Sequence, residues 1–233
     1  MAIKKRASLK NYFLKGSIPK ESEFNDLIDS TINQADDGLE KPAGEAIKVR
    51  AEGKNEELIR FFKNMDDKEP TWKFSQVTEN GNEGFAVSEG EGDSRLFVEK
   101  GGNVGIGVSK PQSKLHVDGF VGMNGRIGFY AHGEVAADGN WHNIVTGLND
   151  YNAFEIIAVM GKKGAHAITH AVAVRAYGKS HGGITKTQSY FGKCRNKIDF
   201  RWTGEYFDYQ LQVRTKRNLG EGVFINYNVT KLF

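Results

Sequence analysis

The stretch between Pro42 and Tyr130 places the strongest constraint on how this chain can fold. Its apolar residues alternate with polar ones over only two or three positions, and the groups lie mostly about 10 residues apart with Gly, Asn or Asp between them. The groups are Ile47/Val49, Trp72/Phe74, Phe85/Val87, Leu96/Val98, Val104/Ile106/Val108, Leu115/Val117 and Ile127/Phe129, while Glu56 to Lys63 fits a strand or a helical turn equally well. Such strands offer few inward side chains, and isolated hairpins are marginally stable in water. We therefore expect this stretch to share its core with identical copies of the chain.

The C-terminal part, residues 131–233, differs because its strands are longer and alternate firmly. We predict strands at Phe154–Met160, Ala165–Tyr177, Lys197–Trp202, Phe207–Val213 and Val223–Val229, with a turn at Gly161–Gly164. About five to seven strands with hairpin-length links are typical of an antiparallel β-sandwich, and roughly 100 residues are enough to bury a core. Trp202 lies in an alternating strand and is expected in that core.

One helix is predicted near the N-terminus. Pro19 suits a first helical turn, and Glu21 and Glu23 suit the positive end of the helix dipole. An apolar stripe follows at helical spacing, Phe24, Leu27, Ile28 and Ile32, and Asp36-Asp37-Gly38 ends the helix. A helix of about four turns is not stable alone, so the stripe must dock on this chain or on a partner. Leu9, Tyr12, Phe13 and Leu14 add apolar surface upstream without an evident intrachain partner.

The glycine-rich sequence GGNVGIGVSKPQSKLHVDG, residues 101–119, could be taken for a phosphate-binding loop. A dinucleotide fingerprint requires a third glycine and a following helix. Here the third glycine is missing after Gly105 and Gly107, and Pro111 together with the alternation of Leu115 and Val117 disfavours a helix. We expect no nucleotide cofactor at this segment.

Candidate catalytic and metal-binding residues do not form a consistent set. His166 and His170 would share one face of a helix, but on the strand predicted there they lie about 13 Å apart, too far for one metal ion. Glu205/Asp208 and Asp138/Asp150 flank aromatic residues and leave carbohydrate hydrolysis imaginable, although the interpretation as turn residues is favoured. No Ser-His-Asp spacing or GxSxG motif occurs. We expect no enzyme, no catalytic residue, no metal and no cofactor.

Composition narrows the setting further. The single cysteine, Cys194, excludes an internal disulfide framework and a CxxC metal site. The basic start of the chain is followed by Lys10, Asn11 and Lys15 in place of an apolar run, which argues against a signal peptide. No apolar run is long enough to span a membrane. The net charge of +3 is unevenly distributed along the chain. Residues 131–233 hold 13 Lys and Arg and 8 Asp and Glu, whereas residues 1–130 have a small acidic excess. No RNA-binding or helix-turn-helix pattern supports nucleic acid.

Residues 101–119 resemble the GNVGIGTxxPxxKLxVxG segment of tail fibres of phages and of phage tail-like contractile injection systems, and of large bacterial surface adhesins. Val108 stands where threonine is common. The segment Tyr12–Phe24 is similar to the N-termini of fibre or pin proteins beside injection baseplates. Further likenesses to the terminal globular domain of that group are Gly133–Val135, Asn140–His142, Asn152–Glu155, Thr187–Gly192 and Arg201–Gly204.

The resemblance implies a homotrimeric tail fibre or baseplate pin in three parts. Residues 1–38 would form a helical attachment segment, 39–130 a β-rich shaft or neck, and 131–233 a β-sandwich head. The stripe Phe24, Leu27, Ile28 and Ile32 would contact baseplate proteins, and the shared trimer core would contain Val104, Ile106, Val108, Leu115 and Val117. The chain would be made in the cytoplasm and act in an assembled particle after release, without membrane insertion. The alternatives are a fibre-borne polysaccharide depolymerase and a stand-alone carbohydrate-binding adhesin.

The head carries the ingredients for contact with cell-surface glycan or lipopolysaccharide. Aromatic rings stack on sugar faces, and cations meet carboxylate or phosphate. Trp141 follows the turn signal Asp138-Gly139-Asn140 and is expected at a loop edge. The candidate glycan-binding residues are Trp141, Lys162, Lys163, Arg214, Lys216 and Arg217.

Overall fold

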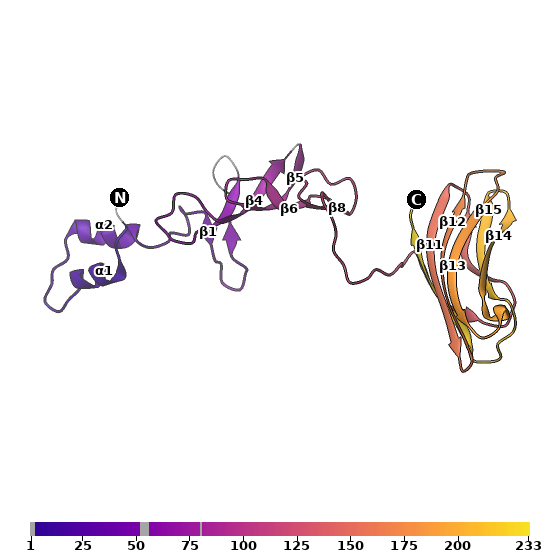
Figure 1. The fold of residues 1–233 in the computed structure, drawn as a ribbon. Coiled ribbons are helices and arrows are strands. Elements are labelled where there is room, and N and C mark those ends of the chain that lie inside the picture. The colour runs from indigo at the N-terminus through magenta and orange to yellow at the C-terminus, as the bar shows by residue number, and fades with distance from the viewer. Residues whose placement is uncertain (1–2, 52–55, 80) are drawn as a thin grey trace. The chain divides into compact units, whose positions relative to one another are not determined.

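The structure, a computed structural model, describes residues 3–51, 56–79 and 81–233 (Figure 1). Strands far outnumber helices among these residues, which confirms the predicted mainly β fold class. The chain divides into two compact units, Met1–Gly122 and Met123–Phe233. Neither helix of the described part has the length and apolar character needed to cross a membrane.

The N-terminal helical segment is a pair of short helices, α1 (Arg6–Tyr12) and α2 (Glu21–Asp29). The upstream residues do have an intrachain partner: the rings of Phe13 and Phe24 meet edge to face at 5.8 Å. In addition, the Tyr12 hydroxyl donates to the Asp26 carboxylate at 3.0 Å. Leu9 is the buried residue of α1. The predicted surface without a partner is therefore partly covered by the chain itself.

The predicted bounds of the helix were wrong at both ends. Pro19 lies outside α2, because the Glu23 carboxylate accepts the backbone N–H of Lys20 at 2.8 Å and fixes Lys20 as the N-cap. The helix stops at Asp29, well before Asp36. At this end the Ser30 hydroxyl donates to the Asp26 carbonyl at 2.6 Å, where a backbone N–H would donate in a continuing helix. Such local side-chain bonds compete with helical backbone bonds and end the helix early.

The middle of the chain forms one six-stranded sheet and a two-stranded ribbon. The sheet runs in chain order through β3 (Glu57–Phe61), β4 (Trp72–Glu79), β5 (Asn82–Glu89), β6 (Ser94–Glu99), β7 (Val104–Ile106) and β8 (Leu115–Val117). All neighbours are antiparallel except β7 and β8, which are parallel. The ribbon pairs β1 (Leu39–Glu40) with β2 (Lys48–Val49). The ambiguous piece after Glu56 is thus a strand.

The predicted strand at Ile127 and Phe129 was wrong. Residues 118–130 form no helix or strand. Gly128 instead lies against the backbone of the last strand, where an added Cβ would fall 2.5 Å from the carbonyl carbon of Val229. The Asn228 amide donates to the Gly128 carbonyl at 3.1 Å. This close contact of Gly128 with the last strand, held by the Asn228 side chain, replaces the regular strand pairing that the alternation suggested.

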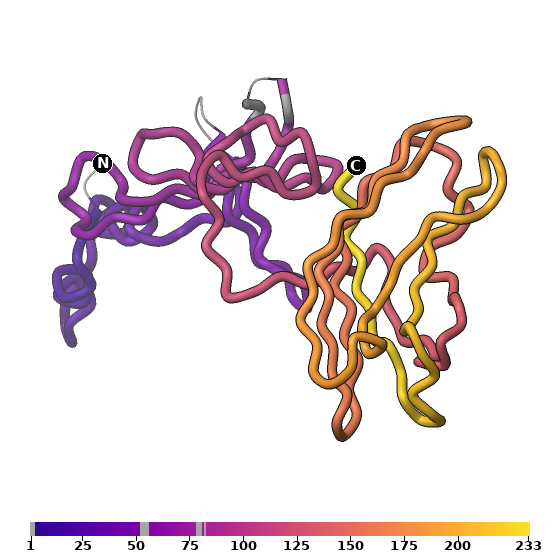
Figure 2. Tube along the Cα trace, turned by 45° about the vertical axis from the view of Figure 1, so that its right-hand side comes forward, coloured from indigo at the N-terminus to yellow at the C-terminus, as the bar shows by residue number. Residues whose placement is uncertain are grey.

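The C-terminal unit is an antiparallel sandwich of eight strands, more than the five to seven expected. Its strands are β9 (Ala131–Ala136), β10 (His142–Leu148), β11 (Asn152–Lys162), β12 (Ala165–Arg175), β13 (Gly183–Phe191), β14 (Ile198–Glu205), β15 (Asp208–Thr215) and β16 (Phe224–Lys231). One sheet has the order β13-β12-β11-β16-β9 and the other β10-β15-β14. A short 3-10 turn, η1 (Cys194–Asn196), precedes β14. Figure 2 shows the two sheets facing each other.

The sandwich has its own core between the sheets. Its fully buried side chains include Phe154, Ile156, Ile198, Leu211, Val213, Ile225 and Val229. The inward positions of β12 carry mostly alanines, Ala165, Ala167, Ala171 and Ala173, which let the sheets pack closely. Trp202 packs at the edge of this core, half-buried, with its ring 6.2 Å from that of Phe154. The predicted self-contained core of the head is present.

Candidate functional site

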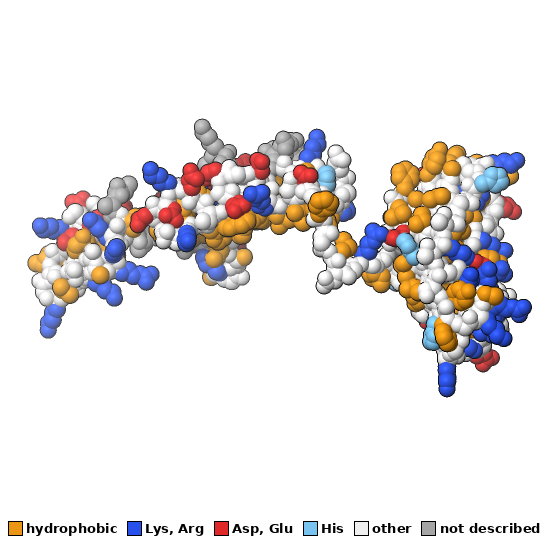
Figure 3. Space-filling view, in the orientation of Figure 1, with side chains coloured by type: hydrophobic (Ala, Val, Ile, Leu, Met, Phe, Trp, Pro, Cys, Tyr) orange, Lys and Arg blue, Asp and Glu red, His pale blue; other side chains and the backbone are white. Residues whose placement is uncertain are grey.

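One face of the six-stranded sheet is apolar and open, and we call it the apolar sheet face. Cross-strand pairing places twelve apolar side chains on it: Ile59, Phe61, Trp72, Phe74, Phe85, Val87, Leu96, Val98, Val104, Ile106, Leu115 and Val117. Trp72, Phe85, Val98, Ile106 and Leu115 are 41%, 36%, 37%, 44% and 59% exposed. Hydrophobic side chains gather along one side of this sheet in Figure 3. Within the described residues of its unit, no second layer covers this face.

On the opposite face of the same sheet, the buried side chains have their contacts within the chain itself. Its buried positions are Lys73, Ser75, Ala86, Ser88, Ser94, Phe97 and Gly105. Burial disfavours the charge on Lys73, but hydrogen bonds and attraction to Glu91 at 2.9 Å and Glu57 at 3.4 Å raise its pKa above the usual value. The fully buried Phe97 ring occupies space that a Cβ on Gly84 would need, at 2.6 Å from its tip. The two faces are thus built differently, and only one of them needs a partner.

The glycines of the 101–119 segment serve the crossover between the parallel strands. A Cβ on Gly105 would collide with the carbonyl oxygen of Val108. Gly107 has a φ of +71°, a left-handed conformation that favours glycine. Close approach within one chain therefore already explains both residues. Since Val108 lies against Gly105, it sits outside the apolar sheet face, whereas Val104, Ile106, Leu115 and Val117 belong to it.

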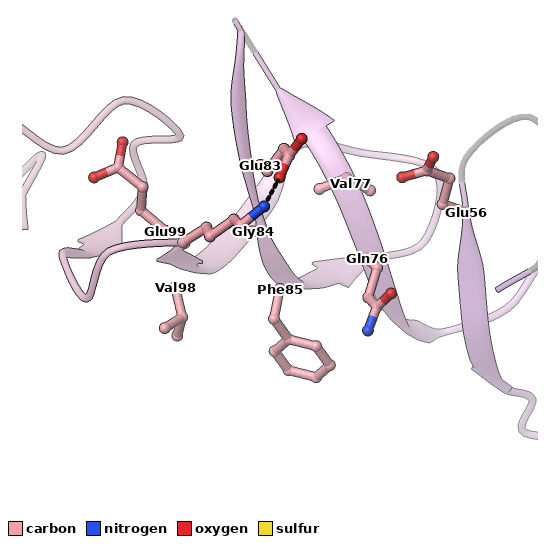
Figure 4. Close-up of a pocket in the computed structure, with 9 residues that line it drawn as sticks. Glu56, Gln76, Val77, Glu83, Gly84, Phe85, Val98 and Glu99 are labelled. Carbon is pink, nitrogen blue, oxygen red and sulfur yellow. Dashed lines mark hydrogen bonds and ion pairs between the residues drawn. The ribbon is translucent and has the colours of Figure 1, made fainter. Parts of the chain in front are cut away.

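A hollow of about 460 Å³ lies at one end of β4, β5 and β6 (Figure 4). It is lined by Glu56, Gln76, Val77, Glu83, Gly84, Phe85, Val98, Glu99 and Lys100. Phe85 and Val98 point away from the carboxylates of Glu83 and Glu99, toward the apolar sheet face. Lys100 hydrogen-bonds Glu83 at 2.6 Å, which lowers the pKa of this glutamate. The hollow is open, and its one lysine is paired with Glu83.

The predicted attachment stripe is only partly helical. Phe24, Leu27 and Ile28 lie on α2, and Ile32 lies beyond its end. Ile28 and Ile32 are 61% and 67% exposed, while Leu27 is half-buried. Although the helix pair covers part of the stripe, apolar side chains remain available to a partner.

The two outer faces of the sandwich differ in chemistry. The outer face of the larger sheet carries an exposed apolar group on β11 and β12, consisting of Ile157, Val159, Ile168, Val172 and Val174. The outer face of the smaller sheet is polar and carries Asn143, Asp199, Arg201, Thr203, Gln210, Gln212 and Arg214. Hydrogen-bonding side chains also occur on the first face, but among the described residues the second face carries no such exposed apolar group.

Trp141 lies on this polar face, half-buried and directly before β10. The guanidinium carbons of Arg201 and Arg214 are 4.4 and 4.2 Å from the centre of its ring. The turn before it is fixed by Asp138, which hydrogen-bonds the His142 ring at 2.8 Å. This bond lowers the pKa of Asp138 to about 2, even though partial burial opposes the charge. Trp141 is therefore a held residue at the start of a strand, and not at a free loop edge.

The other predicted glycan-binding residues have separate partners. Lys216 lies 3.4 Å from the Asp199 carboxylate, and Arg217 donates to the Asn196 amide oxygen at 2.9 Å. Lys162 donates to the Leu219 carbonyl, and Lys163 is exposed at the hairpin tip. Of the predicted cations, Arg214 is the one that stacks on Trp141.

Arg201 joins this group, and sequence reasoning missed it. The signal was present, because the alternation that points Phe200 and Trp202 inward points Arg201 outward.

The remaining candidate chemistries do not assemble. The two histidines, His166 and His170, lie exposed on β12, where the His170 ring meets Glu155 at 2.9 Å. Glu205 and Asp208 face each other at the exposed end of the β14–β15 hairpin. Among the described residues, no group of three His, Cys, Asp or Glu side chains is placed to hold a metal ion.

No known protein-family profile matches the chain, and no curated protein sequence matches it significantly.

Proposed function

We propose that this protein is a structural and recognition subunit of a phage tail-like contractile injection particle, as a homotrimeric tail fibre or baseplate pin. The observation that carries the proposal is the apolar sheet face. A sheet with one hydrophobic face must bury it against another layer, and large open apolar patches on proteins mark interaction sites. Strands β7 and β8 of this face lie in residues 101–119, whose sequence resembles fibre shafts.

Association of identical copies is the simplest way to cover the face. Cyclic symmetry turns the same surface of each copy toward one axis, so apolar side chains meet apolar side chains. The polar opposite face, with Lys73, Glu57 and Glu91, then stays outside. The number three comes from the resemblance of residues 101–119 to trimeric fibre segments.

The two ends of the chain suit attachment and recognition. The helix pair keeps Ile28 and Ile32 exposed for docking in a groove of a baseplate protein. The sandwich has a complete core and can present its polar outer face without help from a partner. Attachment at one end and recognition at the other are the requirements of a fibre.

The oligomeric state of the full chain tests this proposal. Light scattering at micromolar concentration should give about 78 kDa, three times the 25.9 kDa chain. A stable folded monomer would contradict it. Co-sedimentation with tail-like particles from producing cells separates a fibre from a stand-alone adhesin. A glycan-degradation assay with the purified trimer separates a fibre from a depolymerase.

A further inference from the structure

We propose that the polar outer face of the smaller head sheet binds an anionic polysaccharide, and that the guanidinium groups of Arg201 and Arg214 beside Trp141 contact its acidic groups. The inference deepens the proposed function, since it names the ligand class of a head that faces outward. We call the three residues the Trp141 cluster.

Strand register brings the cluster together. Arg201 pairs with Gln212 and Arg214 pairs with Asp199 across β14 and β15, so both arginines lie on the outer face. On the other side of β15, His142 pairs with Val213, which places Trp141 beside Arg214. The ring centre lies 4.4 and 4.2 Å from the two guanidinium carbons. Segments distant in sequence thus converge on one aromatic ring.

The two guanidinium charges are not neutralised by acids of the described part of the chain. Neither Arg201 nor Arg214 forms a salt bridge there, because Asp199, the acidic cross-strand neighbour of Arg214, is occupied by Lys186 and Lys216. The Arg214 Nε is buried and has no hydrogen-bond partner. A guanidinium fork without a carboxylate is matched in geometry to a carboxylate or phosphate from outside.

The cluster is held in place before any ligand arrives. The Arg201 Nε donates to the Gln212 amide oxygen at 2.7 Å, and the Gln212 amide donates to Asn143 at 2.7 Å. Stacking on Trp141 restrains both guanidinium planes. Ordering long side chains in advance removes part of the entropic cost of binding.

The surroundings favour a sugar polymer over other polyanions. Asn143, Thr203, Gln210 and Gln212 share the face, and each retains hydrogen-bonding capacity suited to hydroxyl groups. The site is an open sheet surface and no enclosed pocket, which suits an extended chain. Binding to the phosphates of nucleic acid rests on many cations at once, whereas the whole protein has a net charge of +3.

The outer face of the larger sheet, on the other side of the sandwich from the Trp141 cluster, carries the exposed apolar group of β11 and β12. Ile157, Ile168 and Val174, 41%, 50% and 47% exposed, offer surface for packing against copies of the chain. Contacts between heads would use that face, and the Trp141 cluster on the opposite sheet would remain open to solvent.

Binding of the full-length protein to immobilised polymers at 0.15 M NaCl tests the proposal. The probes are polygalacturonate, whose sugars carry carboxylates, phosphomannan, whose sugars carry phosphates, neutral dextran, and double-stranded DNA. We expect binding to one or both acidic polysaccharides and none to dextran. Arg201→Gln and Arg214→Gln should each weaken binding about tenfold or more, the worth of a charge-assisted hydrogen bond. Lys193→Gln, which removes an equal charge at an exposed position before η1, is the matched control and should change binding less than twofold.

Trp141→Ala should also weaken binding, and Trp141→Phe should restore part of it. Absence of wild-type binding to both acidic polysaccharides would overturn the proposal. Equal loss in the Lys193 variant, or DNA binding as tight as polysaccharide binding, would overturn it too. Measuring the mass of each variant on the same samples distinguishes a failure of the binding proposal from a failure of the proposed trimer. A loss of binding with the mass unchanged concerns the Trp141 cluster alone.

Discussion

Replacing Ile106 by aspartate is the sharpest test of the apolar sheet face. Ile106 is 44% exposed in the single chain, so a carboxylate there remains in contact with water and the sheet should still form. In the proposed trimer the same side chain is enclosed. The substitution therefore separates the stability of the assembly from that of the chain.

The size of the effect follows from burial and titration. Full burial of an isoleucine contributes about 1.5–3 kcal/mol, so its exposed part supplies about 1 kcal/mol per chain on assembly. An enclosed aspartate must stay charged or take up a proton, and protonation at pH 7 from a pKa near 3.9 costs about 4 kcal/mol. Three chains together then lose up to about 15 kcal/mol, or roughly ten orders of magnitude in the association constant.

Sedimentation velocity at micromolar concentration, with circular dichroism for the fold, measures the outcome. We expect Ile106→Asp to be a folded monomer at pH 7 and to regain trimer below about pH 4, where protonation no longer has a cost. Ile106→Asn removes the charge and should weaken the trimer without that pH dependence. Met65→Asp, at a 91% exposed loop position, is the control and should stay trimeric. An Ile106→Asp protein that remains fully trimeric at pH 7 would refute the reasoning.

Three further perturbations test other parts of the structure. Deletion of residues 1–38 should leave a folded trimer that no longer co-purifies with baseplates; continued co-purification would show that the helix pair is not the attachment segment. Gly105→Ala should lower the thermal stability of the first unit by several degrees, because the added Cβ meets the Val108 carbonyl. Gly101→Ala is the comparison: no atom lies within 4 Å of its added Cβ, so only the φ of +116° causes strain. Equal stability of Gly105→Ala and wild type would contradict the role of Gly105 in the crossover between β7 and β8. Asp138→Ala should destabilise the head at neutral pH. The pKa of Asp138 in the folded protein is lowered from 3.8 to about 2, so the stability difference between variant and wild type should be full above about pH 4 and fade as the pH drops through 2. Thermal unfolding across this pH range checks it, and a difference that persists undiminished at pH 2 would assign the effect to packing.

Much of the fold could be predicted because alternation marks strands. The pairs Phe85/Val87 and Leu96/Val98 lie on strands as expected, and β12 lies within the predicted strand Ala165–Tyr177. Alternation did not reveal which side is buried, because the bulky Ile168, Val172 and Val174 of β12 face outward and its alanines face the core. The alternation at Ile127 misled because it lies in an extended segment that forms no regular ladder. Apolar pattern alone cannot distinguish an extended chain from a paired strand.

Other features were not predicted from the sequence because the residues that mark them are polar. Strand β13 alternates Thr185, Thr187 and Ser189 on its outer side, without the apolar contrast that marks a strand. The helix bounds depended on local side-chain bonds of Glu23 and Ser30, whose geometry a spacing rule does not contain. Arg201 could have been found by extending the alternation of its strand, whereas its approach to Trp141 required the register of three strands.

The self-contained core of the sandwich has a consequence for how the protein matures. The head can fold as soon as its own residues are available, at a rate independent of concentration. The apolar sheet face is buried only when chains associate, so the rate of its burial depends on the concentration of the chain. During that wait an unpartnered hydrophobic sheet is prone to aggregate. Yield of the finished assembly should therefore depend on expression level and on chaperone supply, even though every chain carries a correctly folded head.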